Sequence, residues 1–379
     1  MKGKESQNLE DHVCVCCVMD TSDPNIKFDD SGQCSHCRSA SQLLSKVSSH
    51  YSTVTLDDTF QKIKKRNAKN SHDGIIGLSG GLDSAYVLTL AVEHGLRPLV
   101  VHVDAGWNSD ISSSNIRALV EHYDLKLKTI VVNWDEMRRL QVAYLKSGLM
   151  NQDVPQDHAF FASLYRFSAQ QQLNDVITGE NVTTESILPR AWEYGAMDGR
   201  QVRSIARKFD GGSFSSFPFL TIPKLYVADF LLRRLQVHKP LTQVDYSKSE
   251  AQKKLNELIA WKHYEGKHGE SSFTSFYQSV YLPKRFGIDK RRAYLSSLIV
   301  SGQITRSDAL QELAKKPVTE TEERNMIAYV ARKLDISVDE LESYMHMEAV
   351  SHRKFPNHEY LLQLANSDFS KVFRRIVRS

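Results

Sequence analysis

Cysteine is absent from most of this 379-residue chain, because all five cysteines lie between positions 14 and 37. Disulfide frameworks are usually spread through small secreted folds, so this confinement excludes one and indicates a local role for the thiols. No apolar run approaches the roughly 18 residues that span a bilayer, and Met1–Gln7 contain no apolar signal segment. We therefore expect a cytoplasmic protein with no membrane contact.

Charge of one sign is also scarce. The net charge is +4 and the pI is near 8.6, which suits anionic small molecules but lies below the charge density of dedicated nucleic-acid binders. Hydrophobic residues make up 41% of the chain and charged residues 25%, which is typical of a globular protein long enough for two domains. Nucleic acid is therefore not an expected partner.

The clustered cysteines form two C-x2-C pairs separated by sixteen residues. Two such pairs can supply the tetrahedral thiolate set that Zn²⁺ prefers, and four thiolates leave no position for a reacting water. We expect a structural zinc ribbon; its ligands are Cys14, Cys17, Cys34 and Cys37. Two alternatives stay open: Cys16 or His36 in place of one ligand, and an iron–sulfur cluster in place of zinc.

Beyond the ribbon, apolar runs alternate with amphipathic stretches, which predicts a parallel sheet of the α/β, Rossmann-like class. The expected strands are 74–78, 98–103, 127–132 and 176–178. The expected helices between them begin at Asp83, near Ser112 and at Asp135, and Gly95 and Gly148 are expected to end the first and third. Such sheets bind ligands at the carboxyl ends of their strands.

Three polar segments follow expected strands: Ser79–Ser84, Asp104–Asn108 and Gly179–Asn181. Since the carboxyl ends of parallel strands share one edge, we expect these segments to converge on one pocket. Beyond Gly211 the chain reads as mainly helical, with helices expected over 225–235, 249–263, 291–301 and 307–315. The expected domains are a zinc ribbon (1–50), a nucleotide-binding domain (51–213) and a helical region for substrate or partner (214–379).

The first polar segment reads S-G-G-x-D-S and lies between an expected strand and an expected helix. Helix N-termini and glycine-rich turns attract phosphate. No Lys-Ser/Thr pair follows a G-x4-G spacing, and G-x-G-x-x-G does not occur, so two common nucleotide-binding loops are excluded. The alternative is an ordinary capped turn, in which Asp83 is a first-turn acid of a core helix.

This hexapeptide resembles the pyrophosphate-binding loop (PP-loop) of the N-type ATP pyrophosphatases, which bind ATP and adenylate a carbonyl oxygen. The resemblance implies a catalytic, Mg²⁺-positioning role for Asp83 and a Mg²⁺ or pyrophosphate contact for Glu180. It implies that seven other residues of the three polar segments bind ATP. These are Ser79, Gly80, Gly81, Ser84, Asp104, Gly179 and Asn181.

Further motifs extend the resemblance along nearly the whole chain. The cysteine ribbon with Asp20–Pro24, the PP-loop, Thr178–Asn181, Gly266–Ser271 and Lys284–Arg291 together resemble the N-acetyl sugar amidotransferases of bacterial surface-polysaccharide (lipopolysaccharide, O-antigen) biosynthesis. The resemblance implies conversion of an N-acetyl group, on a sugar that is expected to be nucleotide-linked, into an acetamidino group. ATP would adenylate the amide oxygen, and ammonia would then displace AMP.

The ammonia requires a source. Glutaminases of the known types need a catalytic cysteine, yet none follows Cys37 and position 2 is Lys2. We therefore expect a separate glutaminase subunit, similar to the one that serves imidazole-glycerol-phosphate synthesis, with a cyclase-like subunit as a further candidate partner.

A basic segment of the helical region is the candidate substrate site, because its side chains could bind a nucleotide diphosphate. The candidate residues are Lys267, His268, Glu270, Lys284 and Arg291. The alternative is a solvated helix face. His158 is a further candidate, at the start of a helix that lines the pocket; the alternative is a helix-capping or exposed surface residue.

Two rival functions remain. A tRNA thiolase would also join the PP-loop to paired cysteines, but it should be more basic. A zinc-ribbon adaptor would use the nucleotide fold only for docking, and its activity would survive replacement of Asp83.

Overall fold

A five-stranded, wholly parallel sheet lies at the centre of the computed structural model, which describes residues 12–51, 53–263 and 269–361. The strand order is β3-β2-β1-β4-β5, so the chain reverses its direction of travel across the sheet between β1 and β4. The strands are β1 (Gly74–Gly77), β2 (Pro98–Asp104), β3 (Leu127–Val131), β4 (Asp175–Ile177) and β5 (Gln236–His238). The first four confirm the strands expected from the sequence.

Neighbouring residues of the central strands are buried in two different cores. Ile75 and Val101 belong to one cluster, whereas Ile76 and Val100 belong to the other. Successive side chains of a strand point to opposite faces, so both faces of the sheet are covered. This explains why the central strands read as continuous apolar runs.

Helices cover each face of the sheet. One core contains the buried residues of α2 (Leu56–Arg66), α3 (Leu82–Glu93), α4 (Asp110–His122) and α9 (Lys248–Ile259). The other contains those of α5 (Trp134–Ser147), α6 (Val154–Gln170) and α8 (Gly199–Phe209). Gly95 and Gly148 follow α3 and α5 with φ of 71° and 72°, which confirms the two expected helix ends.

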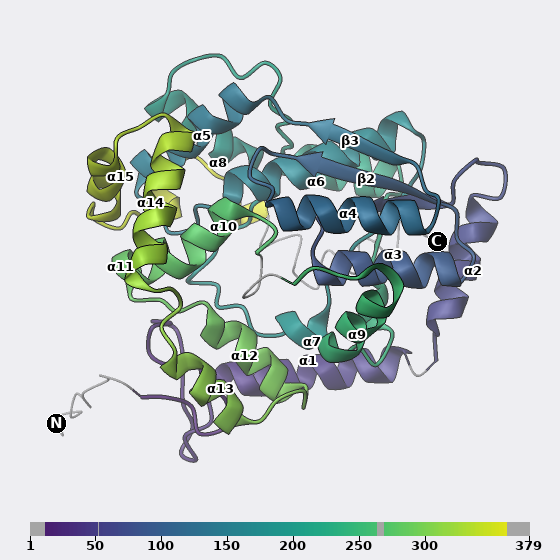
Figure 1. Ribbon diagram of the computed structural model, residues 1–379, viewed down its shortest axis with the longest axis horizontal. Coiled ribbons are helices and arrows are strands. Elements are labelled where there is room, and N and C mark those ends of the chain that lie inside the picture. The colour runs from purple at the N-terminus through teal and green to yellow at the C-terminus, as the bar shows by residue number, and fades with distance from the viewer. Residues whose placement is uncertain (1–11, 52, 264–268, 362–379) are drawn as a thin grey trace.

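The remaining helices lie mostly beside the sheet domain (Figure 1). They are α1 (Ser35–Tyr51), α7 (Val182–Glu185), α10 (Ser272–Phe276), α11 (Leu282–Phe286), α12 (Arg291–Val300), α13 (Arg306–Ala314), α14 (Glu320–Leu334) and α15 (Val338–Met345). Two segments are π-helical, η1 (Lys224–Leu232) and η3 (Tyr277–Tyr281), and two are short 3₁₀ turns, η2 (Pro240–Thr242) and η4 (His352–Lys354). Within the described residues, no helix is long and apolar enough to cross a membrane.

The sheet domain extends beyond the division expected at residue 213. β5 pairs with β4, and α9 packs against α3 and α4, although both lie in the stretch assigned to the helical region. The sequence Gln236-Val237-His238 is short and polar, so it carries no strand signal. Residues 225–235, expected to form an α-helix, instead contain the π-helix η1.

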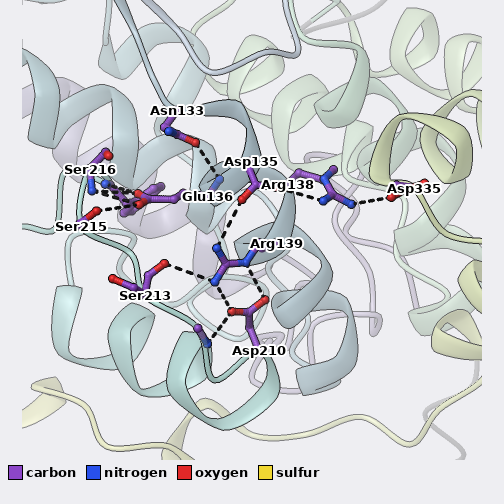
Figure 2. Close-up of polar contacts among 12 residues, drawn as sticks. Asn133, Asp135, Glu136, Arg138, Arg139, Asp210, Ser213, Ser215, Ser216 and Asp335 are labelled. Carbon is purple, nitrogen blue, oxygen red and sulfur yellow. Dashed lines mark hydrogen bonds and ion pairs between the residues drawn. The ribbon is translucent and has the colours of Figure 1, made fainter.

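A polar network joins the N-terminus of α5 to two distant segments (Figure 2). The buried carboxylate of Glu136 accepts hydrogen bonds from the amides of Ser216, at 3.1 Å, and Phe217. Arg139, also on α5, forms an ion pair with Asp210 at 2.6 Å. Because a buried carboxylate needs such donors, Glu136 fixes the loop that carries Phe217 against α6.

His158, on α6, is a structural residue. Its Nδ1 lies 2.7 Å from the carbonyl oxygen of Ala196, and its Nε2 lies 2.9 Å from the amide of Leu220, so the ring donates at one nitrogen and accepts at the other. The Phe217 ring is stacked on the imidazole of His158, with 6.1 Å between the two ring centres. Burial lowers the pKa of His158 to about 4, because the charged form would have neither water nor a second acceptor.

We expect His158 to make the protein less stable in acid. The unfolded chain binds a proton below about pH 6.5, whereas the folded chain does so only near pH 4. The free energy of unfolding should therefore fall by about 3 kcal/mol between these pH values, at 1.36 kcal/mol per pKa unit. Urea unfolding at pH 7 and pH 5 should show a smaller difference for His158→Gln than for the wild type; equal differences would contradict this assignment.

Candidate active site

The S-G-G-x-D-S loop joins β1 to α3 at the point where the strand order reverses. Gly80 has a φ of +83°, and a Cβ built there would lie 2.6 Å from the backbone oxygen of Ser112. Only glycine can therefore occupy this position without strain. The Ser79 hydroxyl accepts from the amide of Gly81 at 3.1 Å, and the Ser84 hydroxyl accepts from the amide of Ser79 at 3.2 Å.

The segment after β4 lies directly against this loop. A Cβ at Gly179 would lie 2.8 Å from the backbone nitrogen of Ser84, so the two backbones approach more closely than any other residue type would allow. The side-chain amide of Asn181 donates to Asp83 at 3.4 Å and, through its oxygen, caps α7 by accepting from Thr184 at 2.8 Å. The expected convergence of these two segments is confirmed.

Asp83 has two further neighbours that the sequence did not indicate. The hydroxyl of Tyr246 donates to the Asp83 carboxylate, and burial together with that carboxylate raises the pKa of Tyr246. Burial lowers the pKa of Lys248, but the nearby Tyr294 and Asp83 outweigh it and raise the pKa above its ordinary value. Lys248 therefore stays protonated at neutral pH.

The third segment, after β2, is held in a tight turn. The Asp104 carboxylate accepts from the Gly106 amide at 2.7 Å and from the Asn108 side chain at 2.9 Å. The same turn bonds to the start of α10, because the Ser109 amide donates to the carbonyl oxygen of Glu270 at 2.9 Å. The helical region thus lies beside this segment, and Glu270 borders it through its backbone.

The other predicted site residues lie in different surroundings. Glu180 is partly exposed and pairs with Lys239. Lys284 pairs with Glu323 of α14. Arg291 pairs with Asp289 at 2.7 Å and bonds to two carbonyl oxygens at the end of α13 and just after it. Lys267 and His268 lie outside the described residues. The structure therefore holds Lys284 and Arg291 by contacts within the helical region.

The four cysteines expected to bind metal form one buried cluster. Their sulfur atoms all lie within 4.8 Å of one another, with Cys14 Sγ 3.8 Å from Cys37 Sγ and Cys17 Sγ 3.7 Å from Cys34 Sγ. Several backbone amides point at these sulfurs; that of Cys34 lies 3.2 Å from Cys14 Sγ. The donor set fits a tetrahedral metal ion bound by thiolates.

The two alternative ligands do not belong to this cluster. Cys16 is exposed, and His36 bonds to the Asp23 carboxylate at 2.6 Å. The cluster is attached to the helical region, because Arg306 donates to the carbonyl oxygens of Cys14 and Cys17 at 2.9 Å.

Comparison with known proteins gives low similarity to solved structures. The NH3-dependent NAD synthetase of Campylobacter jejuni is 18% identical, with 53% of this chain and 82% of that chain covered and a TM-score of 0.29. The NMN synthetase of Francisella tularensis is 18% identical, with 61% and 98% covered and a TM-score of 0.29.

The U34-tRNA thiolase NcsA of Methanococcus maripaludis, solved with its [4Fe-4S] cluster, is 16% identical, with 89% and 90% covered and a TM-score of 0.29. No curated protein matches the sequence. A family model does match the helical region, and it confirms the similarity expected there. Residues 270–367 are similar to the family described as "LPS biosynthesis protein WbpG-like, C-terminal domain".

Proposed function

We propose that this protein is a cytoplasmic, ATP-dependent amidotransferase of lipopolysaccharide or related glycan biosynthesis. It converts an N-acetyl group of a nucleotide-linked sugar into an acetamidino group. The observation that carries the proposal is the meeting of the S-G-G-x-D-S loop with Gly179–Asn181 at the switch point of a parallel sheet, beside a WbpG-like C-terminal domain. The first feature supplies ATP chemistry, and the second supplies the class of substrate.

The loop is suited to hold the phosphates of ATP. Its amides lie at the N-terminus of α3, where the helix dipole favours negative charge, and Lys248 adds a cation. Asp83 and Glu180 are the carboxylates that would hold Mg²⁺, an ion that neutralises phosphate charge as pyrophosphate leaves. The protein thus positions the reactants and stabilises charge.

The proposed reaction has two steps. The acetamido oxygen attacks the α-phosphorus of ATP, and the bond to pyrophosphate breaks. Ammonia then attacks the imidate carbon, and AMP leaves with the former amide oxygen, so that the sugar carries an amidine. Adenylation is needed because an amide oxygen is otherwise a poor leaving group.

Ammonia is proposed to come from a separate glutaminase subunit similar to that of imidazole-glycerol-phosphate synthesis, with a cyclase-like subunit as a further partner. No cysteine lies outside residues 14–37, and four of the five belong to the metal cluster. The purified chain alone is therefore expected not to release glutamate from glutamine.

Mass spectrometry tests the proposal. Incubation of a UDP-diacetamido sugar with the protein, ATP, Mg²⁺ and ammonium should give AMP and a product whose mass differs by the exchange of one oxygen for NH. ATP–pyrophosphate exchange stimulated by tRNA, and not by UDP-linked N-acetyl sugars, would favour the thiolase instead.

A further inference from the structure

A second group of ionisable side chains has no role in the proposed reaction. Asp157 lies on α6, Glu193 in the segment before α8, Lys290 at the start of α12 and Tyr277 in η3. We call these four residues the α6 cluster. They come from four separate elements, so the packing of the sheet domain against the helical region creates the cluster.

The members face one another. Lys290 forms an ion pair with Glu193, and its Nζ lies 5.8 Å from the centre of the Tyr277 ring. Burial raises the pKa of Asp157 well above its usual range, and the neighbouring carboxylates Asp153 and Glu193 add to the shift. Asp153, one turn before Asp157, accepts from Thr274 at 3.0 Å, and Thr274 lies one turn before Tyr277.

One polar atom in this cluster is buried without a partner. The side chain of Tyr277 is 0% exposed, yet its hydroxyl has no hydrogen-bond partner among the described residues. Burial raises the pKa of this hydroxyl well above its ordinary value, and the charges of Asp153, Glu193 and Asp157 add to the shift. An unpartnered buried hydroxyl costs stability, so the group is explained if a ligand completes it.

The start of α6 lies beside the segment that follows β2, because Gln156 accepts from Ser271 at 2.9 Å and the Ser272 amide donates to the carbonyl oxygen of Trp107 at 2.9 Å. The carboxylate of Glu180 is close enough to add to the raised pKa of Asp157, and Glu180 follows Gly179, whose backbone lies against the S-G-G-x-D-S loop. One π-helical segment is part of the cluster, because Tyr277 belongs to η3. Insertions of this kind occur frequently at functional sites.

The chemistry of the cluster restricts its ligand. The carboxylates Asp153, Asp157 and Glu193 would repel a phosphate, and Lys290 would repel a second cation. Within the described residues, only the four cysteines converge closely enough to hold a metal ion, so the carboxylates of the cluster are not a metal site. Acceptors and donors that lie side by side fit a neutral molecule whose hydroxyls both donate and accept.

We propose that the α6 cluster is the subsite for the sugar ring of the acceptor: the ring hydroxyls donate to Asp157 and Glu193, and Tyr277 and Lys290 donate to ring oxygens. The inference rests on the proposed function and deepens it, because it separates the sugar from the nucleotide. The sugar seated here has its acetamido group next to Glu180 and the ATP phosphates.

The test measures how much the sugar adds to binding. Isothermal titration calorimetry compares UDP with UDP-N-acetylglucosamine, UDP-N-acetylgalactosamine and a UDP-diacetamido sugar. For the wild type, at least one sugar is expected to bind more tightly than UDP. In Tyr277→Phe, the affinity for that sugar relative to UDP should fall about tenfold, as expected for one hydrogen bond to a ligand. In Asp157→Asn it should fall at least as much. Both variants should keep the affinity for UDP itself.

Stability separates a binding role from a structural one. Tyr277→Phe removes a buried hydroxyl that lacks a partner, and Asp157→Asn removes a charge that its surroundings disfavour. The melting temperature without ligand should therefore stay equal or rise in both variants. Tyr144→Phe is the matched control, since Tyr144 is also 0% exposed with an unpartnered hydroxyl but lies on α5. Tyr144→Phe should likewise keep or raise the melting temperature, and it should leave the affinity for the sugar relative to UDP unchanged.

The outcomes that overturn the subsite differ from those that overturn the proposed function. An unchanged affinity for the sugar relative to UDP in Tyr277→Phe and Asp157→Asn overturns the subsite, and so does a wild type that binds no sugar more tightly than UDP. Amidine formation at the wild-type rate by Asp157→Asn overturns the subsite alone. Absence of amidine from wild-type protein with every sugar of the panel, despite intact sugar binding at the α6 cluster, overturns the proposed function alone.

Discussion

The Asp83→Asn variant is expected to lose the gain in ATP affinity that Mg²⁺ provides. Asparagine keeps the shape of the side chain and can still accept from Tyr246, but it removes the charge that a magnesium ion requires. With Mg²⁺ present, the dissociation constant for ATP should rise by about tenfold or more. Without Mg²⁺ it should not rise, because the carboxylate then only repels the phosphates.

Isothermal titration calorimetry with and without Mg²⁺ measures this difference directly. The comparison does not depend on knowing the acceptor, because it concerns ATP alone. The fold should be unaffected: a first-turn acid contributes about 0.3–1 kcal/mol through the helix dipole, so the melting temperature should change little.

Asp110→Asn is the matched control. Asp110 is an exposed acid in the first turn of α4, the helix after β2, just as Asp83 lies in the first turn of α3, the helix after β1. Both variants lose the same interaction with a helix dipole, but only Asp83 belongs to the S-G-G-x-D-S loop. If the two variants bind Mg·ATP equally well, the loop is only a capped turn, and the adaptor hypothesis gains support.

The strands that are buried on both faces could be predicted from the sequence, because such burial requires a run of apolar residues. β1 and β2 are buried on both faces, so they read as apolar runs, and the glycines after α3 and α5 marked helix ends through their positive φ. β5 was not predicted, because an edge strand of three residues needs few apolar side chains. The boundary expected at residue 213 missed it for the same reason.

In the candidate site, the residues of a local motif could be predicted, and those from distant parts of the chain could not. The loop at Ser79–Ser84 is continuous in sequence, and its glycines are required by close backbone contacts, so the motif carried the geometry. Tyr246 and Lys248 reach Asp83 from a distant part of the chain, and no local pattern marks them. A basic segment drew attention to Arg291, whereas the structure pairs the neighbouring Lys290 with Glu193 and bonds Arg291 to carbonyl oxygens.

The metal cluster gives the second large expected effect. We expect Cys17→Ser to lose the bound metal and to lower the melting temperature by about 5 °C or more, because metal binding in such sites contributes directly to folding. Cys17 is fully buried, and its sulfur lies 3.7 Å from that of Cys34. Its loss should also weaken the helical region, since Arg306 bonds to the Cys17 carbonyl oxygen and Val18 packs against Leu295.

Cys16→Ser is the matched control, because the adjacent thiol is exposed and lies outside the four-sulfur cluster. It should keep about one metal ion per chain, measured by elemental analysis, and the wild-type melting temperature. Zinc leaves the protein colourless, whereas an iron–sulfur cluster absorbs visible light, so a spectrum identifies the metal. If the role is structural, Cys17→Ser should still bind Mg·ATP below its melting temperature; loss of that binding in a folded variant would instead connect the metal with the nucleotide site.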